Sequence, residues 1–576
     1  MTLLIGYAIT ASVYASLALM LAFLVADRKG IVEIMRRRFS KYSIVALALI
    51  LAFFLIFELV YVSPLEQLYF DENIYQAIAL NILHSGQALW CQFGTGLVHT
   101  CYINQVYHDP VGWSAIIAIA FAIFGVGIGT AFALELLAGA ISIALLFLLA
   151  GMLSERKEYA VLSAFTLAMM PLLSVWARTQ ADVDLPFMML VILAFLLFTI
   201  FVKRRSFNAL AAFGFGLVFV TYMRTEAILL VPLFLILLFT FSDDGIARTL
   251  RKNIRAAVEA LKDNIKVLVV LLVALLLIAT QVYYIGTQLQ NPNYGQAFNQ
   301  SVVSFSSFQS NIGINLLFLV GHYDQLSFYP AVFSYTIAPL AVLGVVALLL
   351  RNKARNRYGM LLLTGAWFLT YFLFYTSFFA GYATYGVDSR FMLQVMPPLI
   401  LLASFALLGI SDAGVALAKR ARRGIGVHGT RLLFYAVLTV TSVALIIVPF
   451  ALVLNLTTLP PSAMPQQVVI APAMSNFYAN YTDVPRNCLV FSNTPDTWLE
   501  ENYSSLQLEY IGSTNRSMNA TISSYSCKVM DYGYWCLVPP FFCNAYMNEF
   551  KMQSLIPYSV NVSNKSIQFY RLLNYT

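Results

Sequence analysis

Two adjacent carboxylates, Asp71 and Glu72, stand in the segment Phe-Asp-Glu-Asn-Ile-Tyr between two long apolar runs. A carboxylate in such a place can act as a general base and take the proton from an attacking hydroxyl group. Residues 63–113 also contain three of the five histidines and pass through a His-Asp-Pro sequence to a tryptophan. This density of polar residues beside apolar spans indicates a functional site.

Charged residues also lie in three short connections between later apolar spans. They are Arg178 with Asp182 and Asp184, Arg224 with Glu226, and Asp388 with Arg390. Ionisable groups at membrane depth usually face a cavity or a partner, because burial in lipid is unfavourable. Arginine binds phosphate through paired hydrogen bonds, so a cavity that combines arginines with Asp71 suits transfer chemistry on a lipid-linked phosphate. Alternatively, the first two groups are ion pairs that hold helix ends together, and Glu58 and Glu135 inside spans are structural polar contacts.

A divalent metal site is a further candidate. His108 and His322, with Asp109 or Asp324, supply imidazole and carboxylate ligands of the kind that divalent metals bind. Their spacing matches no diagnostic metal motif, and a loop histidine is more often a solvated surface group. Both interpretations stay open at this point.

The composition is that of an integral membrane protein. Of the 576 residues, 60% are hydrophobic and only 11% are charged, whereas a soluble protein has about 25% charged residues. The net charge of +8 comes from short basic clusters between apolar spans, which is the pattern of cytoplasmic membrane loops. Nucleic-acid binding is excluded on this ground.

Windows of about 20 apolar residues predict an all-α polytopic membrane protein with about twelve transmembrane helices. The predicted spans are 3–25, 43–62, 129–152, 159–177, 183–202, 207–222, 225–242, 267–285, 331–350, 358–376, 391–410 and 432–454. The basic cluster that follows the first span, from Arg28 to Lys41, places the N-terminus outside. The segments that become external are 63–112, 286–330, 377–390 and the tail from Asn455 onward. The apolar stretch 111–125 is short for a span, so we expect a helix on the outer surface.

All six cysteines fall in these external segments, where disulfides persist. Among the possible pairings we favour Cys91–Cys101, Cys488–Cys527 and Cys536–Cys543, on grounds of proximity and shared domain. Asn-x-Ser/Thr sequons are dense in the tail. Glycosylation and a chance match in an Asn- and Ser-rich domain explain them about equally well.

A change of composition after residue 454 predicts two domains. Residues 1–454 form the transmembrane catalytic region, including the external loop 63–112, and residues 455–576 form an external soluble domain rich in Tyr, Asn and Ser. Within the tail, Asn487 to Ser492 predicts a strand, and Thr494-Pro495-Asp496 can cap a short helix with Pro in its first turn. We expect a small disulfide-linked α/β domain.

Several motifs occur in the order that is typical of one superfamily. In the first external loop they are Asp71-Glu72, Tyr75 and Ser85-Gly86, followed by His108-Asp109-Pro110 and Trp113 at the end of the loop and by Phe124-Gly125 at the end of the surface helix. Later in the chain they are Asp184-Leu-Pro, Arg224 after a span, and Arg390-Phe391 with Pro397-Pro398-Leu399. The set resembles the GT-C superfamily of polytopic glycosyltransferases. It is most similar to the family 39 type branch of protein O-mannosyltransferases and aminoarabinose-type lipid glycosyltransferases. The resemblance covers roughly residues 43–410.

The resemblance implies an inverting enzyme that takes a sugar from a polyprenyl (dolichyl-type) phosphate and transfers it to a hydroxyl group of a glycan, lipid or protein. It assigns Asp71 and Asp184 as catalytic and Arg224 and Arg390 as phosphate-binding. To these we add Glu72 as a catalytic candidate and Tyr75 and Arg178 as substrate- and phosphate-binding candidates. In that family the first-loop Asp is the catalytic carboxylate, so Asp71 is the expected general base. The implied location is the outer face of a prokaryotic, in particular archaeal, plasma membrane or the lumenal face of the endoplasmic reticulum.

The sequence departs from the family at two places. Asn73 and Ile74 stand where the family often has a basic residue after Asp-Glu. Asp109 stands where the family commonly has a Lys before Pro at the end of the first external loop. Two alternatives therefore stay under consideration. An oligosaccharyltransferase of the same superfamily would carry Trp-Trp-Asp-Tyr-Gly, of which only Asp531-Tyr532-Gly533 is present, and a secondary transporter would show matching halves, which are not evident here.

Overall fold

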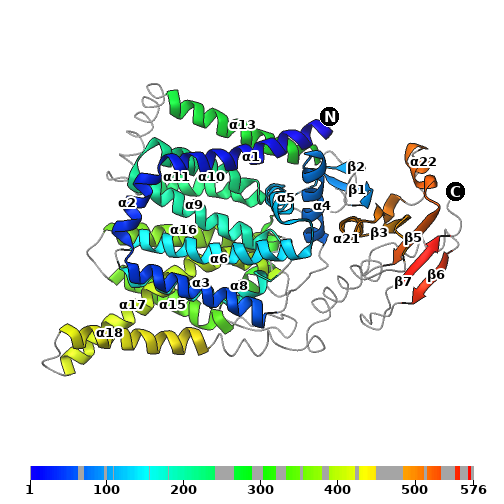
Figure 1. The fold of residues 1–576 in the computed structure, drawn as a ribbon. Coiled ribbons are helices and arrows are strands. Elements are labelled where there is room, and N and C mark those ends of the chain that lie inside the picture. Colours follow the sequence, from blue (N-terminus) through cyan, green and yellow to red (C-terminus); the bar gives the residue numbers. More distant parts are fainter. Residues whose placement is uncertain are drawn as a thin grey trace.

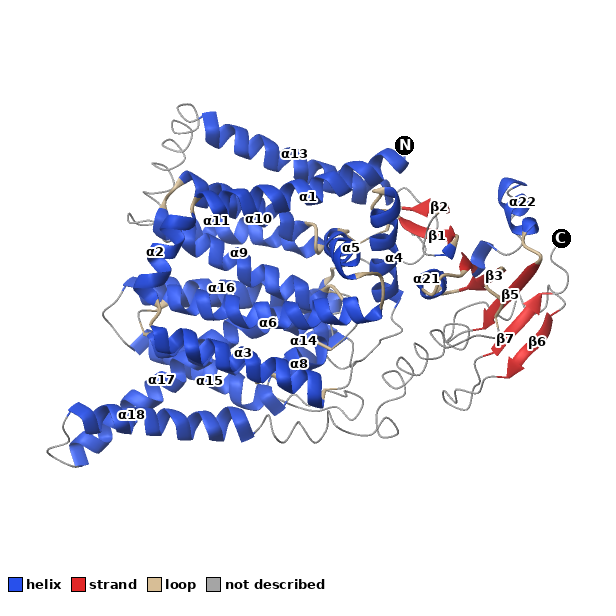
Figure 2. Ribbon diagram, viewed as in Figure 1, coloured by secondary structure: helices blue, strands red, loops and turns tan. Residues whose placement is uncertain are grey.

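The computed structural model shows long helices packed side by side, with a β-sheet at one end (Figure 1). It describes residues 2–62, 70–96, 100–107, 109–154, 156–178, 181–240, 265–288, 303–319, 332–350, 355–378, 388–421, 427–448, 484–510, 516–532, 552–557 and 568–572. All named strands lie at the same end of the molecule (Figure 2). We call this the sheet end.

Within the described residues, eight helical segments are long and apolar enough to cross a membrane. They belong to α1 (Thr2–Ala26), α3 (Lys41–Tyr61), α6 (Ile128–Leu153), α9 (Asp184–Arg204), α13 (Ile265–Gln288), α16 (Arg355–Ser377), α17 (Met396–Ala421) with the preceding 3-10 helix η3 (Asp388–Val395), and α18 (Val427–Ser442) with the π-helix η4 (Val443–Ile447). The protein is therefore a polytopic helical membrane protein, as predicted.

The four other predicted spans also fall on helices. These are α7 (Lys157–Ala168) with α8 (Pro171–Trp176), α10 (Phe207–Thr221), the 3-10 helix η2 (Thr225–Leu229) with α11 (Leu230–Thr240), and α15 (Val332–Leu350). The span predicted at 159–177 is interrupted because Pro171 cannot donate a backbone hydrogen bond to the preceding turn. The exact number of twelve stays a prediction.

The core of the bundle is built around α9 and the part of α17 up to Leu408, where most side chains are buried. Phe195 of α9 stacks on Trp367 of α16 with ring centroids 4.0 Å apart. Helices that are apolar on every side are expected in the interior of a large membrane protein. This rigid centre fixes the N-terminus of α9, which carries Asp184.

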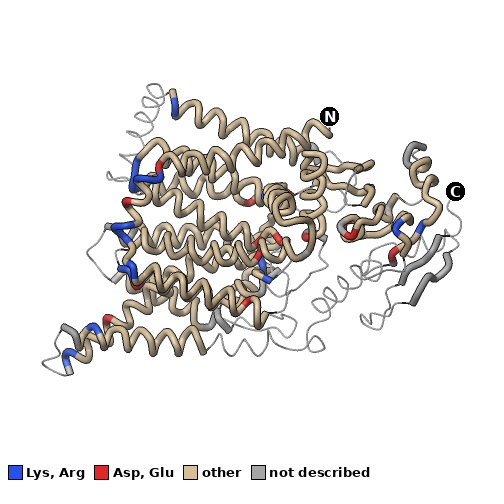
Figure 3. The backbone as a smooth tube through the Cα atoms, in the orientation of Figure 1, with Lys and Arg blue, Asp and Glu red and all other residues tan. Residues whose placement is uncertain are grey.

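Basic residues gather at the end of the bundle opposite the sheet (Figure 3). We call this the basic end; it consists of α2 (Arg28–Arg38), the start of α7 and the ends of α9 and α17. Two ion pairs link elements there: Arg204 with Asp27 at 3.2 Å and Arg156 with Asp412 at 2.7 Å. This separation agrees with the predicted orientation, in which the loops with basic clusters are cytoplasmic and the tail is external.

Two helices of the predicted external region lie at the sheet end. The segment 63–112 is not simply a loop, because it contains α4 (Phe70–Ser85) and the hairpin of β1 (Trp90–Gly94) and β2 (Cys101–Gln105). Every residue of α4 from Glu72 to Ile82 is buried, so this part of the helix is enclosed on all sides. The surface helix predicted at 111–125 is α5 (Gly112–Phe124). It packs against α4 and ends at Gly125, whose φ is +92°.

Several helices were not predicted, among them the one at Phe305–Leu319. Helix α14 (Phe305–Leu319) lies in the interval 286–330, which the sequence indicated only as an external loop. Its polar residues explain the omission, because buried Asn311 donates to the carbonyl oxygens of Thr376 and Phe378 at 3.2 and 2.8 Å. Helix α14 thus packs on α16 through hydrogen bonds, and its apolar residues Phe318 and Leu319 are also buried.

The sheet combines strands from two distant parts of the chain. Its order is β2-β1-β4-β3-β5-β7-β6, with β3 (Cys488–Ser492), β4 (Ser504–Gln507), β5 (Cys527–Tyr532), β6 (Met552–Pro557) and β7 (Gln568–Leu572). Strand β3 lies between β4 and β5 and pairs in parallel with both, and the other pairings are antiparallel. Helices α21 (Pro495–Glu500) and α22 (Arg516–Ser524) lie in the same tail.

The local predictions for the tail are confirmed in part. The predicted strand is β3 and the predicted short helix is α21, with Pro495 in its first turn. Thr494 stands at the N-cap position, but its side chain makes no capping hydrogen bond. The disulfides Cys91–Cys101 and Cys488–Cys527 are present as predicted, whereas the third predicted pair, Cys536–Cys543, lies outside the described residues.

A buried acid marks the contact between the hairpin and the tail. The Trp90 indole N–H donates to both carboxylate oxygens of Asp496, each at 3.2 Å. Burial raises the pKa of Asp496 well above its ordinary value, although the bond from Trp90 acts in the opposite direction. An acid whose pKa is raised by folding favours the folded state most at low pH, below about pH 4. Its contribution is lost as the pH rises toward the raised pKa.

We therefore expect Asp496→Asn to stabilise the protein relative to wild type increasingly as the pH rises from about 4 to 8. The amide keeps an oxygen that can accept from Trp90 but never carries a charge. The measurement is thermal unfolding of both purified proteins in the same detergent across this pH range. A stability difference that is independent of pH would contradict the prediction.

Candidate functional site

The centre of the site is a buried ion-pair network at the sheet end of the bundle. Arg224 lies between two carboxylates: its Nη1 is 2.6 Å from Oδ1 of Asp184, and its Nε is 2.6 Å from Oε1 of Glu226. Burial by itself lowers the pKa of Arg224, but Asp184 and Glu226 raise it well above its ordinary value. The guanidinium is therefore permanently charged, and its side chain is 16% exposed.

Arg390 joins the same network from η3, through longer contacts. Its Nη1 is 3.6 Å from Oδ2 of Asp182, and its Nε is 3.5 Å from Oδ2 of Asp184. Gln394, one turn later, donates to the main-chain oxygen of Asp184 at 3.0 Å. Asp184 thus holds both arginines together, and η3 is fixed against the start of α9.

Aromatic side chains enclose this network. The hydroxyl of Tyr375 donates to Oε1 of Glu226 at 2.8 Å. The ring of Phe391 lies 5.4 Å from the guanidinium carbon of Arg224 and 5.1 Å from that of Arg390, within the range of cation–π attraction. The arginines are thereby held in place while part of each side chain remains accessible.

The beginning of α5 aligns the two turns that carry these charges. The indole N–H of Trp113 donates to the carbonyl oxygen of Ala181 at 3.1 Å, and the N–H of Gly112 donates to that of Tyr222 at 2.7 Å. A Cβ at Gly112 would lie 2.5 Å from the Tyr222 oxygen, so only glycine permits this approach. The first two residues of α5 therefore hold the turns that carry Asp184 and Arg224 close to each other.

Helix α4 connects the predicted catalytic segment to this network. The hydroxyl of Tyr75 donates to Oδ2 of Asp109 at 3.1 Å, and Tyr75 is close enough to Arg224 to interact with it electrostatically. Asp71 is the second residue of α4, one turn before Tyr75, and Glu72 is buried on the same helix. The structure thus brings the backbone of the Asp71 turn to the end of the bundle that holds Arg224.

Arg178 makes different contacts from those of the other predicted arginines. Its Nε donates to the carbonyl oxygen of Val62 at 3.2 Å. Burial lowers the pKa of Arg178, and Glu58, the carboxylate that interacts with it, acts in the opposite direction. The alternative ion pair of Arg178 with Asp182 is therefore not the contact found, whereas that of Arg224 with Glu226 is. The role of Arg178 in phosphate binding stays a prediction.

The candidate metal ligands are placed only in part. His108 and His322 lie outside the described residues, and Asp109 binds Tyr75. Among the described side chains, no group of three or more His, Cys, Asp or Glu is arranged to hold a metal ion. The divalent metal stays a prediction, and no step below depends on it.

Sequence reasoning missed two residues of the network, Tyr375 and Gln394. Tyr371 and Tyr375 are four residues apart at the end of an apolar span, which places both on one helix face. That spacing was the available signal for Tyr375. No local pattern distinguishes Gln394, because its partner is a main-chain oxygen on another helix.

Similar architectures exist among solved structures. The fold matches ArnT from Cupriavidus metallidurans in the apo state, with a TM-score of 0.56, 14% identity, and coverage of 91% of this chain and 97% of that chain. The chain shares the fold of this protein. The same enzyme bound to undecaprenyl phosphate matches with a TM-score of 0.54, 14% identity, and coverage of 92% of this chain and 98% of that chain.

A third similar structure is an oligosaccharyltransferase from Archaeoglobus fulgidus in the apo form. Its TM-score is 0.50 at 14% identity, with coverage of 86% of this chain and 70% of that chain. In sequence, residues 108–284 match the family described as dolichyl-phosphate-mannose-protein mannosyltransferase. A comparison with curated protein sequences gives no match. The predicted resemblance to the O-mannosyltransferase and aminoarabinose transferase branch is thereby confirmed.

Proposed function

We propose that the protein is a membrane glycosyltransferase that moves a sugar from a polyprenyl-phosphate donor to a hydroxyl acceptor. The observation that carries the proposal is the convergence of two partly exposed arginines, Arg224 and Arg390, on Asp184 at the end of the bundle that holds α4. Arginine pairs suit a phosphate. A similar structure, ArnT from Cupriavidus metallidurans, is bound to undecaprenyl phosphate, which supports a donor of this class.

The proposed reaction is a single inverting displacement. The acceptor hydroxyl oxygen attacks the anomeric carbon as Asp71 takes its proton, and the bond from that carbon to the phosphate oxygen breaks. The polyprenyl phosphate leaves with the electron pair, and its developing charge is stabilised by Arg224 and Arg390. Asp184 holds the two guanidinium groups next to each other and orients the acceptor.

The proposed location of this site is the extracytoplasmic face. Basic clusters favour the cytoplasm, and they gather at the end of the bundle opposite the sheet (Figure 3). Both disulfides among the described residues belong to the sheet end, and disulfides persist in oxidising compartments. The outer leaflet of a prokaryotic membrane, in particular an archaeal one, or the lumenal leaflet of the endoplasmic reticulum fits this orientation.

The test is product formation by the purified protein in vesicles supplied with a set of defined polyprenyl-phosphate sugars. We expect sugar transfer to a hydroxyl of a lipid, glycan or peptide, with release of polyprenyl phosphate, and none in vesicles without the protein. Transfer of an oligosaccharide to a peptide asparagine would favour the oligosaccharyltransferase alternative. Solute flux across sealed vesicles with no transfer product would favour a transporter and contradict the proposal.

A further inference from the structure

The hairpin of the first external segment and the tail form one continuous sheet. Strand β1 pairs with β4, with Phe93 opposite Leu506 and Gly94 opposite Ser505. Beyond β1, a Cβ at Gly96 would lie 2.5 Å from the carbonyl oxygen of Asn502, so this contact requires glycine. The tail therefore reaches the bundle through specific main-chain contacts with the hairpin.

Helix α21 of the tail docks directly on α4. The Thr497 hydroxyl oxygen accepts a hydrogen bond from the Nδ2 of Asn73 at 3.2 Å, and both side chains are buried. Leu499 belongs to the same buried apolar cluster as Ile74 and Tyr75. The tail thus completes the core around the beginning of α4.

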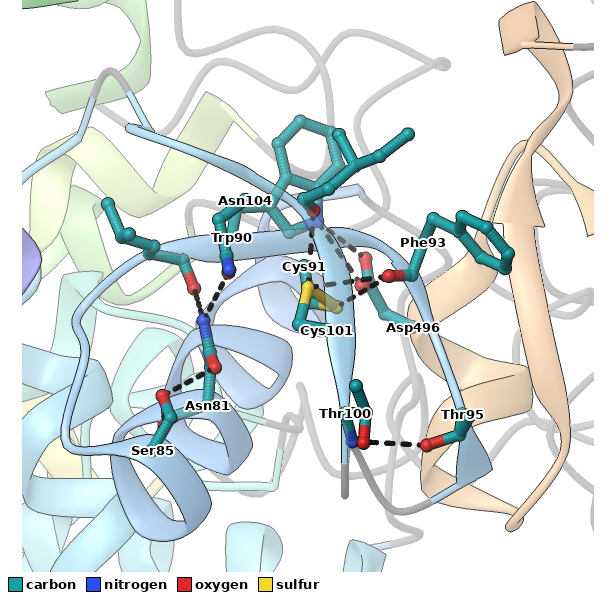
Figure 4. The surroundings of a disulfide bond; sticks show 12 residues. Asn81, Ser85, Trp90, Cys91, Phe93, Thr95, Thr100, Cys101, Asn104 and Asp496 are labelled. Atoms are coloured by element: carbon teal, nitrogen blue, oxygen red, sulfur yellow. Dashed lines mark hydrogen bonds between the residues drawn. A yellow bond between two sulfur atoms is a disulfide. The ribbon is translucent and has the colours of Figure 1, made fainter. Parts of the chain in front are cut away.

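A second buried polar contact lies beside the first. Figure 4 shows Asp496 reaching the indole of Trp90, next to the disulfide Cys91–Cys101. Asp496 is only 1% exposed. Buried polar contacts contribute little net stability but demand one geometry. Two such contacts at the same interface define the position of α21 on α4 and β1 more narrowly than apolar packing would.

The turn of α4 that α21 contacts is the turn that carries the proposed base. Asn73 lies two residues after Asp71 and two before Tyr75 on one helix. Tyr75 in turn binds Asp109 and interacts with Arg224. A displacement of this turn would therefore move Asp71 relative to the arginines, and a misplacement of about 1 Å can lower a catalytic rate by roughly 10²-fold.

We infer that α21 is a positioning element for the active site: Thr497, through Asn73, and Asp496, through Trp90 of β1, fix α21 against α4 and thereby fix the turn of α4 that carries Asp71. This inference rests on the proposed function. Neither residue touches the reacting atoms, so both are positioning residues. The tail is thereby part of the catalytic unit, not only an attached domain.

The first test does not depend on activity. Hydrogen exchange of backbone amides in residues 70–76 is compared between wild type, Thr497→Val and the matched control Ser492→Ala, using the full-length protein in detergent. Ser492 also uses its hydroxyl inside the tail, donating to Asp531 at 2.8 Å. We expect exchange at 70–76 to accelerate roughly ten-fold or more in Thr497→Val, since a buried donor loses its acceptor, and to stay unchanged in Ser492→Ala. Unchanged exchange in Thr497→Val would overturn the inference.

The second test separates positioning from simple stability. We expect Thr497→Val and Asp496→Leu to lower kcat roughly 10- to 100-fold with little change in the KM for the donor, and Asp496→Asn to retain near-normal kcat because it keeps an acceptor for Trp90. A normal kcat in the folded Thr497→Val and Asp496→Leu proteins would overturn the inference. If α4 is released in the exchange experiment but wild type transfers no sugar, the proposed function fails while the contact of α21 with α4 stands.

Discussion

Asp71→Asn is expected to lower the kcat of sugar transfer by roughly 10²–10⁴-fold, which is the usual contribution of a general base. The amide cannot accept the proton of the acceptor hydroxyl, whereas its size and its place in the second position of α4 are unchanged. The measurement is the transfer rate at saturating donor and acceptor. The KM for the donor should change little, because Arg224 and Arg390 rather than Asp71 hold the phosphate.

Asp412→Asn is the matched control for this substitution. Asp412 is also a carboxylate at the end of a helix bundle, but it pairs with Arg156 at the basic end. It should retain normal transfer and expression. If Asp71→Asn transfers sugar at nearly the wild-type rate, Asp71 is not the base, and Glu72 becomes the next candidate on the same helix.

The two arginines of the site should respond differently to truncation. Arg224→Ala leaves Asp184 and Glu226 without the guanidinium that contacts both at 2.6 Å, so we expect a loss of about 3–5 kcal/mol in stability, as for other broken buried pairs. Arg390 makes contacts of 3.5 and 3.6 Å and can turn toward a phosphate more readily. Arg390→Ala should therefore lower stability less and lower kcat/KM for the donor roughly 10- to 150-fold, the effect of one charge-assisted hydrogen bond.

Thermal unfolding and donor kinetics of both variants check this difference. Arg37→Ala is the control, because Arg37 forms an exposed pair with Glu33 on α2 and such pairs contribute little. Equal losses of stability in the two site variants would show that Arg390 is as firmly bound as Arg224. A normal donor kcat/KM in Arg390→Ala would remove Arg390 from the phosphate site.

Much of the architecture follows from local sequence patterns. Each predicted span falls on one helix or on two consecutive helical segments, because an apolar run long enough to cross lipid must satisfy its own backbone hydrogen bonds. Cys91 and Cys101, ten residues apart, pair in the hairpin, and the alternation of spans already placed the turns with Asp184, Arg224 and Arg390 on the same side as Asp71. The break at Pro171 and the helix α14 escaped this reasoning, because one depends on a single proline and the other is held by buried asparagines.

The sequence by itself therefore determined which segments form long apolar helices, which turns share one end of the bundle and which residue types meet there. Only the tertiary structure decided the partners. Arg178 donates to the carbonyl oxygen of Val62 rather than to Asp182, Arg224 binds both Asp184 and Glu226, and the tail joins the hairpin in one sheet. Span and turn signals are local, since they depend on hydrophobicity and backbone chemistry over some twenty residues. Pairing between residues tens or hundreds of positions apart depends on how the helices pack, which no local pattern specifies.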